Sequence, residues 1–498
     1  MITLVSPRLP YGFARRHGVL LLDAGDIAVV GLREGADPRA LIETRRALGR
    51  PLQIERMEGA AFDRRLADVY AEETLSGADA ELDMPGGLDG LVDDLPAAED
   101  LLDSANDAPV IRLINGVIAE AVRQGASDIH LETYEAALVV RMRVDGVLRE
   151  TLRLNPRAAS VIVSRIKVMA RLDIAERRVP QDGRMSLSLG GRSLDVRVST
   201  LPARGGERVV LRILDKDQTG LTLDQLGMNA DEIAVFRRAL SEPNGIVLVT
   251  GPTGSGKTTS LYAALNLLND GTRNILTVED PVEYAIDGVG QTQVNAKVGM
   301  TFAAGLRAIL RQDPDVVMVG EIRDSETASV AVQAALTGHL VLSTVHTNDA
   351  IGAVTRLKDM GVEPFLIAST VRLVMAQRLV RRLCEHCKRE DVADAAVTRL
   401  IGAKAGQRIW RPVGCDRCGQ TGYVGRVGLY EVARIDETLR GMISGGAGED
   451  DLAAVAFKAK DRLERRARKA VTDGQTSVEE ALRAARQETA PDTVEEAA

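Results

Sequence analysis

The stretch GPTGSGKTT at residues 251–259 has the composition and spacing of a phosphate-binding loop. It follows the apolar run GIVLVT and precedes SLYAALNLL, which suits a helix. In this context glycines let backbone N–H groups surround phosphate oxygens at a helix N-terminus. Lys257 would supply a positive charge to the phosphates, and the Thr258 hydroxyl could bind Mg²⁺. The predicted phosphate-binding residues are Gly251, Pro252, Thr253, Gly254, Ser255, Gly256, Lys257, Thr258 and Thr259.

Acidic residues follow two other apolar segments that are typical of buried strands. In DVVMVGEIRD, Glu321 stands where an acid could organise a metal ion or water beside the phosphates. The commoner pattern has an aspartate after the strand, but here Gly320 and Glu321 stand there, so Glu321 is expected to reach Mg²⁺ through water. The segment NILTVEDPVEY delivers Glu279, Asp280 and Glu283 at a strand end, where open α/β sheets bind ligands. We expect Glu279 to orient an attacking water, and the alternative for each acid is a solvated loop carboxylate or a helix cap.

Two of the five histidines frame one predicted strand in LTGHLVLSTVHTND. A single histidine near a strand is more often a hydrogen-bonded core residue, and this alternative stays open for both His339 and His346. The strand would lie beside the phosphate-binding strands. His346, at its C-terminal end, is therefore the better candidate for sensing phosphate.

The four cysteines form two pairs, Cys384/Cys387 and Cys415/Cys418, in the pattern C-x₂-C…C-x₂-C. Such a pattern in a large chain predicts a Zn²⁺ site with four sulfur ligands. The site would be structural, because four thiolates leave no coordination position for water. Four thiols without metal, or disulfides, are the alternatives, and His386 would be redundant as a ligand.

The elements that must position these residues begin near Leu221. From there the apolar runs GIVLVTG, NILTVED, PDVVMVGE and HLVLSTVH alternate with helical segments, which predicts a parallel sheet in a doubly wound α/β domain. We place this domain at residues 221–498 and the cysteine subdomain at about residues 381–425. After the cysteines, GQTGYVGRVGLYE is expected to return to the sheet.

The chain before this domain divides into three parts. Residues 108–220 combine a helical pattern with alternation suited to strands, which predicts an α+β domain. Residues 76–107 contain many acids but no lysine or arginine, so we expect an extended, self-repelling linker. Residues 1–75 would form a small module that includes a helical, arginine-rich stretch from Ile42 to Tyr70.

The bulk composition excludes some classes of function. The 498 residues carry a formal net charge of -8, which works against sequence-independent binding of nucleic acid. No apolar run reaches the roughly 18 residues that a membrane helix needs. Arginines and acids near the start occupy the region where a signal peptide needs an apolar core. We therefore expect a cytoplasmic protein that reaches any membrane through its partners.

The phosphate loop, VEDPVEY, GEIRD and TGHLVLSTVHTND follow one another in the order and close spelling of the secretion ATPases. The chain resembles the type II secretion branch (general secretory pathway protein E), close to pilus-assembly ATPases. The resemblance extends over about residues 108–490 and includes ASDIHLE, PQDGR, GGERVVLRIL and the ending TDGQTSVEEALRAARQ. It implies a RecA-like motor domain with a zinc subdomain, preceded by a PAS-like α+β domain and a small N-terminal module.

The resemblance also implies ATP, Mg²⁺ and Zn²⁺ as ligands and a homohexamer in which arginines complete each nucleotide site. On the motifs, Arg197 and Arg212 match the family's sensing arginines of the second domain, and Arg307 and Arg311 match the motor-domain pair. The alternative for each is a surface or sheet-edge arginine. Lys257, Glu279, Glu321, His346, Arg197 and Arg212 are thus the catalytic candidates. The implied partners are the L-type cytoplasmic domain and the F-type platform protein of the secretion system.

Three other functions stay open at this point. A pilus-extension ATPase also carries the zinc pairs, and the short first module favours secretion only modestly. A nucleic-acid translocase would use a similar phosphate loop, but the acidic composition and the histidine segment count against it. A non-catalytic scaffold would need its catalytic acids to be missing, whereas Glu279 and Glu321 are present.

Overall fold

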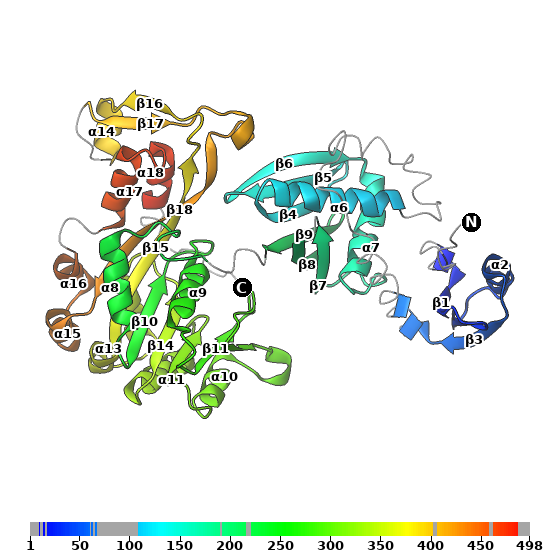
Figure 1. Cartoon of the computed structure of the whole chain (residues 1–498), viewed down its shortest axis with the longest axis horizontal. Helices are drawn as coiled ribbons and strands as arrows, with labels where there is room; N and C mark the ends of the chain where they lie inside the picture. The colour runs from blue at the N-terminus through cyan, green and yellow to red at the C-terminus, as the bar shows by residue number, and fades with distance from the viewer. Residues whose placement is uncertain are drawn as a thin grey trace. The chain divides into compact units, whose positions relative to one another are not determined.

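The computed structural model describes most of the chain and divides it into two compact units, residues 1–216 and residues 217–498 (Figure 1). The described residues are 9, 13–14, 17–59, 61–62, 65–66, 108–189, 192–215, 221–401, 406–457 and 462–486. The predicted acidic linker at residues 76–107 lies outside the described residues. Each unit has its own buried apolar clusters.

The first module is a three-stranded sheet with one helix. Its elements are β1 (Val19–Asp23), β2 (Ala28–Arg33), α2 (Arg39–Leu48) and β3 (Leu52–Met57). The helix expected from Ile42 to Tyr70 ends early, because Gly49 takes a left-handed conformation with φ 64° and Pro51 follows it. The next residues, Leu52–Met57, pair with β2 as a parallel strand, so the helical pattern expected around Ile42 to Tyr70 does not hold there, and the module is a small α/β one.

A six-stranded antiparallel sheet forms the rest of the first unit, in the order β6-β5-β4-β9-β8-β7. Its strands are β4 (Ala126–Thr133), β5 (Leu138–Val144), β6 (Val147–Leu154), β7 (Gln181–Leu189), β8 (Arg192–Ala203) and β9 (Gly206–Asp215). The helices α6 (Ala108–Arg123) and α7 (Ala159–Met169) pack in one core with the sheet. In β4, Ile129 and Leu131 enter that core, so the alternating residues Asp128, His130 and Glu132 point to the opposite face.

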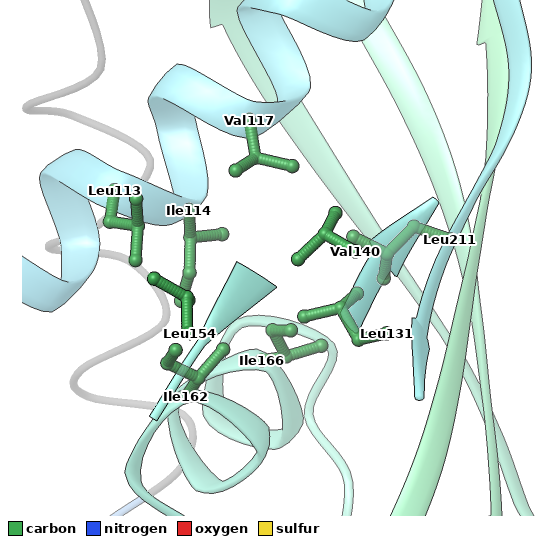
Figure 2. A pocket seen from close by; sticks show the side chains of 9 residues that line it. All are labelled: Leu113, Ile114, Val117, Leu131, Val140, Leu154, Ile162, Ile166 and Leu211. Carbon is green, nitrogen blue, oxygen red and sulfur yellow. The ribbon is translucent and has the colours of Figure 1, made fainter. Parts of the chain in front are cut away.

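A small cavity lies between these helices and the sheet (Figure 2). Its lining is entirely aliphatic and consists of Leu113, Ile114, Val117, Leu131, Val140, Leu154, Ile162, Ile166 and Leu211. The volume of about 10 Å³ is at the lower limit for holding one water molecule, and a water there would find no side-chain hydrogen-bond partner. The cavity is therefore a dry packing gap in the core.

The second unit is built on a seven-stranded sheet in the order β12-β11-β13-β14-β10-β15-β18. Neighbouring strands are parallel except β15 and β18, which are antiparallel. The strands are β10 (Gly245–Thr250), β11 (Ile275–Glu279), β12 (Val289–Gln293), β13 (Val316–Val319), β14 (Leu340–Val345), β15 (Val371–Leu383) and β18 (Tyr423–Arg434). The four predicted strands are confirmed as β10, β11, β13 and β14.

Helices cover both faces of this sheet. One buried cluster joins it to α8 (Ala230–Leu240) and α9 (Lys257–Leu268). The other joins it to α10 (Phe302–Ile309), α11 (Ser325–Leu336), α12 (Gly352–Asp359) and α13 (Pro364–Thr370). Every residue of β10, β13 and β14 is buried. Because both faces are covered, only the ends of these strands can present polar side chains to a ligand.

The cysteine region is inserted between β15 and β18, and the predicted return to the sheet is confirmed by the pairing of these two strands. The inserted elements are β16 (Arg389–Val392), α14 (Ala395–Ile401) and β17 (Arg408–Arg411). The final helices are α15 (Glu437–Ser444), α16 (Glu449–Ala456), α17 (Leu463–Thr472) and α18 (Val478–Arg486). Among the helices within the described ranges, none has the length and apolar character needed to cross a membrane.

Candidate active site

The phosphate loop leaves the carboxyl end of β10 and enters the first turn of α9. Gly251, Gly254 and Gly256 have φ of 144°, 79° and 87°, a region that residues with a side chain rarely adopt. A methyl group on Gly251 would also collide with the carbonyl oxygen of Gln377 in β15. Backbone conformation and close approach to β15 thus both require glycine at residue 251.

Lys257 is nearly buried, with 9% of its surface exposed. Its Nζ donates to the carbonyl oxygens of Gly251 at 2.7 Å and Pro252 at 3.1 Å. Burial lowers the pKa of Lys257 to about 8, while the charge of Glu321 opposes this shift and the charge of Arg378 adds to it. The lowered pKa means that the surroundings disfavour the ammonium group, and a nearby anion would relieve this penalty.

Glu279 ends β11 in a buried, fully hydrogen-bonded position. Its carboxylate accepts hydrogen bonds from the Tyr262 hydroxyl, from Thr277 Oγ1 at 2.6 Å and from Gln291 Nε2 at 3.1 Å. Burial and the charge of Glu279 raise the pKa of Tyr262, so the phenol stays a proton donor. These contacts hold the carboxylate in one orientation. Sequence reasoning missed Tyr262 and Gln291.

Glu321 and His346 meet at the ends of the neighbouring strands β13 and β14. His346 Nε2 lies 3.1 Å from one carboxylate oxygen of Glu321, and Arg323 Nη2 lies 2.5 Å from the other. Glu321 is also close enough to Lys257 for its charge to act on the lysine. The predicted acid and histidine therefore meet at the carboxyl edge of the sheet, the edge from which the phosphate loop leads to Lys257.

His339 lies at the opposite end of β14 and has structural contacts. Its Nδ1 lies 2.9 Å from the carbonyl oxygen of Ala334 and 3.2 Å from Thr337 Oγ1. These partners belong to the end of α11 and the turn that follows. His339 is thus the hydrogen-bonded histidine of the alternative interpretation, whereas His346 contacts a site acid.

The two predicted motor-domain arginines lie together at the end of α10. Arg307 Nη2 lies 2.6 Å from Glu326 Oε1 in the first turn of α11. Arg311 Nη1 donates to the carbonyl oxygen of Arg307 at 2.8 Å. Their roles toward a nucleotide stay a prediction.

The predicted arginines of the first unit occupy one row on the face of the sheet that points away from the core. Arg197 of β8 lies opposite Arg212 of β9, and Arg184 of β7 lies opposite Arg197. Arg212 Nε donates to Asp128 Oδ1 at 2.8 Å, and 58% of the arginine side chain is exposed. Residues in register on neighbouring strands share a face, so the three arginines present one cationic row. Its role in catalysis stays a prediction.

The four cysteines converge as predicted, with their sulfur atoms all within 4.8 Å of one another. The Cys384–Cys415, Cys387–Cys418 and Cys415–Cys418 sulfur pairs are 3.9, 3.9 and 3.7 Å apart. Four thiolates around one Zn²⁺ at about 2.3 Å would be about 3.8 Å apart, so the set fits a tetrahedral ion. The cysteines are not disulfide-bonded, which rules out that alternative.

Backbone donors support a thiolate at this cluster. The amides of Cys415 and Gly422 both donate to Cys418 Sγ at 3.2 Å. Burial acts to raise the pKa of Cys418, but these amides and the neighbouring thiols outweigh it and lower the pKa to about 6. A thiolate is the form that binds a metal ion.

The doubly wound sheet, the phosphate loop and the acids at its carboxyl edge define the class of P-loop ATPases. The fold resembles the ATPase DotB of Legionella pneumophila, with a TM-score of 0.56, 23% identity, and coverage of 74% of this chain and 94% of that chain.

Comparison with protein families gives a narrower assignment. The model "Type II/IV secretion system protein" matches residues 103–483, and a model for an N-terminal domain of "GSPII protein E" matches residues 8–70. The chain belongs to the type II/IV secretion system protein family, in its type II secretion branch.

Full-length relatives agree with this assignment. The chain is 53% identical over 483 residues to "Type II secretion system protein E" of Klebsiella pneumoniae, covering 97% of both chains. It is 51% identical over 488 residues to "Type II secretion system ATPase E" of Vibrio cholerae, covering 96% of both. The resemblance inferred from the motifs is therefore confirmed, and it extends into the first 70 residues.

Proposed function

We propose that this chain is the ATPase motor of a type II secretion system, which hydrolyses ATP to drive pseudopilus assembly and protein export across the outer membrane. The observation that carries the proposal is the contact of His346 with Glu321 at the edge of the sheet where Lys257 lies against the phosphate loop. Near-full-length identity to proteins named for type II secretion favours this system over pilus extension.

The residues of the site have complementary roles in this proposal. The loop amides and Lys257 bind the phosphates of ATP, and Thr258 in the first turn of α9 is the ligand for Mg²⁺. When bound, Mg²⁺ would neutralise charge that develops on the phosphates. Glu279 orients the attacking water while Glu321 holds metal-bound water, and the two acids are alternatives for the base. His346 reports through Glu321 on the γ-phosphate.

Assembly completes the site in the proposal. In a homohexamer, Arg197 and Arg212 of the first unit and Arg307 and Arg311 of the motor domain supply positive charge to the transferring phosphate. The first module, at residues 1–75, docks to the L-type inner-membrane protein, and the motor acts on the F-type platform protein. Both contacts would place a cytoplasmic motor on the inner face of the inner membrane.

Removal of the loop lysine tests the proposed activity. Lys257→Ala should lower the ATPase rate of the assembled protein by about 100-fold or more, because the phosphates lose a fixed cation. Lys297→Ala is the matched control, since this lysine is exposed in the short helix at Ala296–Val298. Its rate should equal that of the unaltered protein. A fully active Lys257→Ala variant would refute the proposal.

The four cysteines are proposed to hold one structural Zn²⁺ per chain. Metal analysis of the purified full chain should find about one zinc, and Cys415→Ser with Cys418→Ser should abolish it. The double variant should unfold at a lower temperature, because the ion stabilises only the folded arrangement. Purified protein without zinc would contradict this assignment. An unfolding temperature that stays the same after a chelator removes the zinc would contradict it as well.

A further inference from the structure

Two residues of β15, Gln377 and Arg378, lie directly against the phosphate loop, although no sequence motif singled them out. β15 runs parallel to β10, with Thr250 opposite Ala376. The chain beyond Thr250 is the phosphate loop, and the chain beyond Ala376 is Gln377 and Arg378. The register of one strand pair therefore places these two residues at the candidate nucleotide site.

Gln377 contacts the loop at both of its ends. A methyl group on Gly251 would collide with the Gln377 carbonyl, and one on Gly256 would lie 2.9 Å from the Gln377 side-chain nitrogen. Gln377 Oε1 also accepts a hydrogen bond at 2.8 Å from Ser260 Oγ in α9. The space that the two motif glycines leave open is thus occupied by this buried glutamine.

Arg378 links the loop to the segment that carries His346. Its Nη2 donates to the carbonyl oxygen of Asn348 at 2.6 Å, and its Nη1 donates to that of Gln377 at 3.2 Å. The same Nη1 would lie 3.3 Å from a methyl group on Gly251. Asn348 follows His346 by two residues, so one guanidinium lies between the phosphate loop and the histidine segment.

The burial of this arginine is costly for folding. Arg378 is only 2% exposed, and it is among the largest fully buried side chains of the described residues. A buried cation destabilises a fold unless its charge and its donors are used, and an apolar side chain of similar volume is often better for stability. The strand around it is otherwise largely apolar, with Val374, Met375, Ala376 and Val380 in the buried clusters. A requirement for the positive charge itself would explain why an arginine stands there.

We infer that Arg378 is a positioning residue for phosphate binding, whose buried guanidinium places a second cation beside Gly251, which Lys257 also contacts, and ties the loop to the His346 segment. The inference rests on the proposed nucleotide binding by this loop. It assigns to β15 the role of holding the phosphate loop in place, in addition to the contacts that the loop itself makes with phosphate. Loss of the charge weakens binding of phosphates, and loss of the tie uncouples His346 from the loop.

Titration of the full chain with a fluorescent ADP analogue tests the inference. Arg378→Gln should weaken ADP binding by about tenfold or more, because a cation near the phosphates is lost. Arg378→Lys keeps the charge and should stay within about threefold of the unaltered protein. Arg372→Gln is the matched control, because this partly buried arginine lies at the other end of β15, where it bonds to Asn244. The control should bind ADP normally.

The outcomes separate a positioning role from general damage to the fold. If the substitutions merely damaged the fold, the unfolding temperature and the fraction of protein that binds ADP would fall together. Arg378→Lys would then fail to restore binding. Arg378→Met is a second neutral variant of similar length for the case in which the glutamine variant does not fold. If neither neutral variant folds, Arg378→Lys decides alone, and a tenfold loss of affinity in it overturns the inference.

The lysine of the loop distinguishes this inference from the proposed function. Normal ADP binding by Arg378→Gln, alongside lost binding by Lys257→Ala, would overturn the role of Arg378 and leave the motor intact. Normal binding by Lys257→Ala would instead refute nucleotide binding by the loop. Weakened binding in both, with rescue by Arg378→Lys, supports the inference.

Discussion

The two large sheets of this protein keep their charged residues in different places. The parallel sheet of the second unit is buried on both faces, so Glu279 and Glu321 stand at or just beyond the carboxyl ends of strands, and Lys257 begins the helix that follows β10 and the phosphate loop. The antiparallel sheet of the first unit is covered on one face by α6 and α7. Its other face bears Asp128, Glu132 and their arginine partners.

The charges are also balanced differently. Glu132 pairs with Arg141 at 2.5 Å and with Arg208 at 2.6 Å. Burial acts to raise the pKa of Glu132, but Arg141, Tyr134 and Arg208 lower it overall, as arginines do for Asp128. Lys257 instead donates to carbonyl oxygens in the loop. Arginines therefore neutralise the buried acids of the first sheet, whereas Lys257 at the edge of the second sheet bonds to carbonyl oxygens and is available to an anion.

Neutralising the edge acids should produce the largest effect on activity. Glu279→Gln and Glu321→Gln should each lower kcat for ATP by about 100-fold or more, since an amide neither activates water nor holds metal-bound water. ADP binding should persist in both variants, because the loop is unaltered. Glu437→Gln, at an exposed position in the first turn of α15, is the control.

The roles of the two acids are distinguished by which substitution lowers kcat more. A larger loss in Glu279→Gln supports its role as the base, and a larger loss in Glu321→Gln transfers that role. Rates equal to the control in both variants would show that the edge carboxylates are not used in hydrolysis. The contrast between catalytic acids at the edge of the second sheet and paired acids on the face of the first would then fail.

Breaking a charge pair in the first unit should produce the largest effect on stability. Lys167 of α7 forms a buried ion pair with Glu207 of β9, and both side chains are almost fully enclosed. Glu207→Ala should destabilise the fold by about 3–5 kcal/mol, because it leaves a buried ammonium without its partner. Lys167→Met with Glu207→Leu should restore most of the loss. Denaturant unfolding of the full chain measures both variants.

The matched change in the second unit is Lys257→Met. Its cost should be about 1 kcal/mol or less, because burial already disfavours the ammonium group of Lys257, and within the described residues no ion pair joins it to an acid. An equal loss of stability in Lys257→Met and Glu207→Ala would contradict the difference in charge balance between the two sheets.

The contrast between the two units also shows which contacts the sequence could predict. Strand ends that follow apolar runs placed Glu279, Glu321 and His346 at one edge, because parallel strands point their carboxyl ends the same way. The contact of Arg378 with the loop could not be predicted, since it depends on β15 lying beside β10. β15 was not recognised as a strand, because its sequence VRLVMAQRLVRRL carries four arginines. The contact of Tyr262 with Glu279 could not be predicted either, because Tyr262 lies in a mostly apolar helical segment and looks like an ordinary core residue.

Neutralising the arginine row should affect activity more than stability. Arg212→Gln should lower the ATPase rate of the assembled protein about tenfold or more, as expected for an arginine that stabilises the transition state. Its cost in stability should be about 1 kcal/mol, because 58% of the side chain is exposed. Arg153→Gln, an exposed arginine that pairs with Glu150 on the same sheet, is the control. A normal ATPase rate in Arg212→Gln would show that this face of the sheet has only a structural role.

Filling the cavity of the first unit should produce the smallest effect. Val140→Ile adds one methylene group beside a gap of about 10 Å³, so the variant should gain about 0.5–1 kcal/mol. Val139→Ile is the control, because the neighbouring valine is buried but does not line the gap, and overpacking there should bring no gain. Denaturant unfolding measures both. A loss in Val140→Ile as large as that in Val139→Ile would show that the core under the charged face is already closely packed.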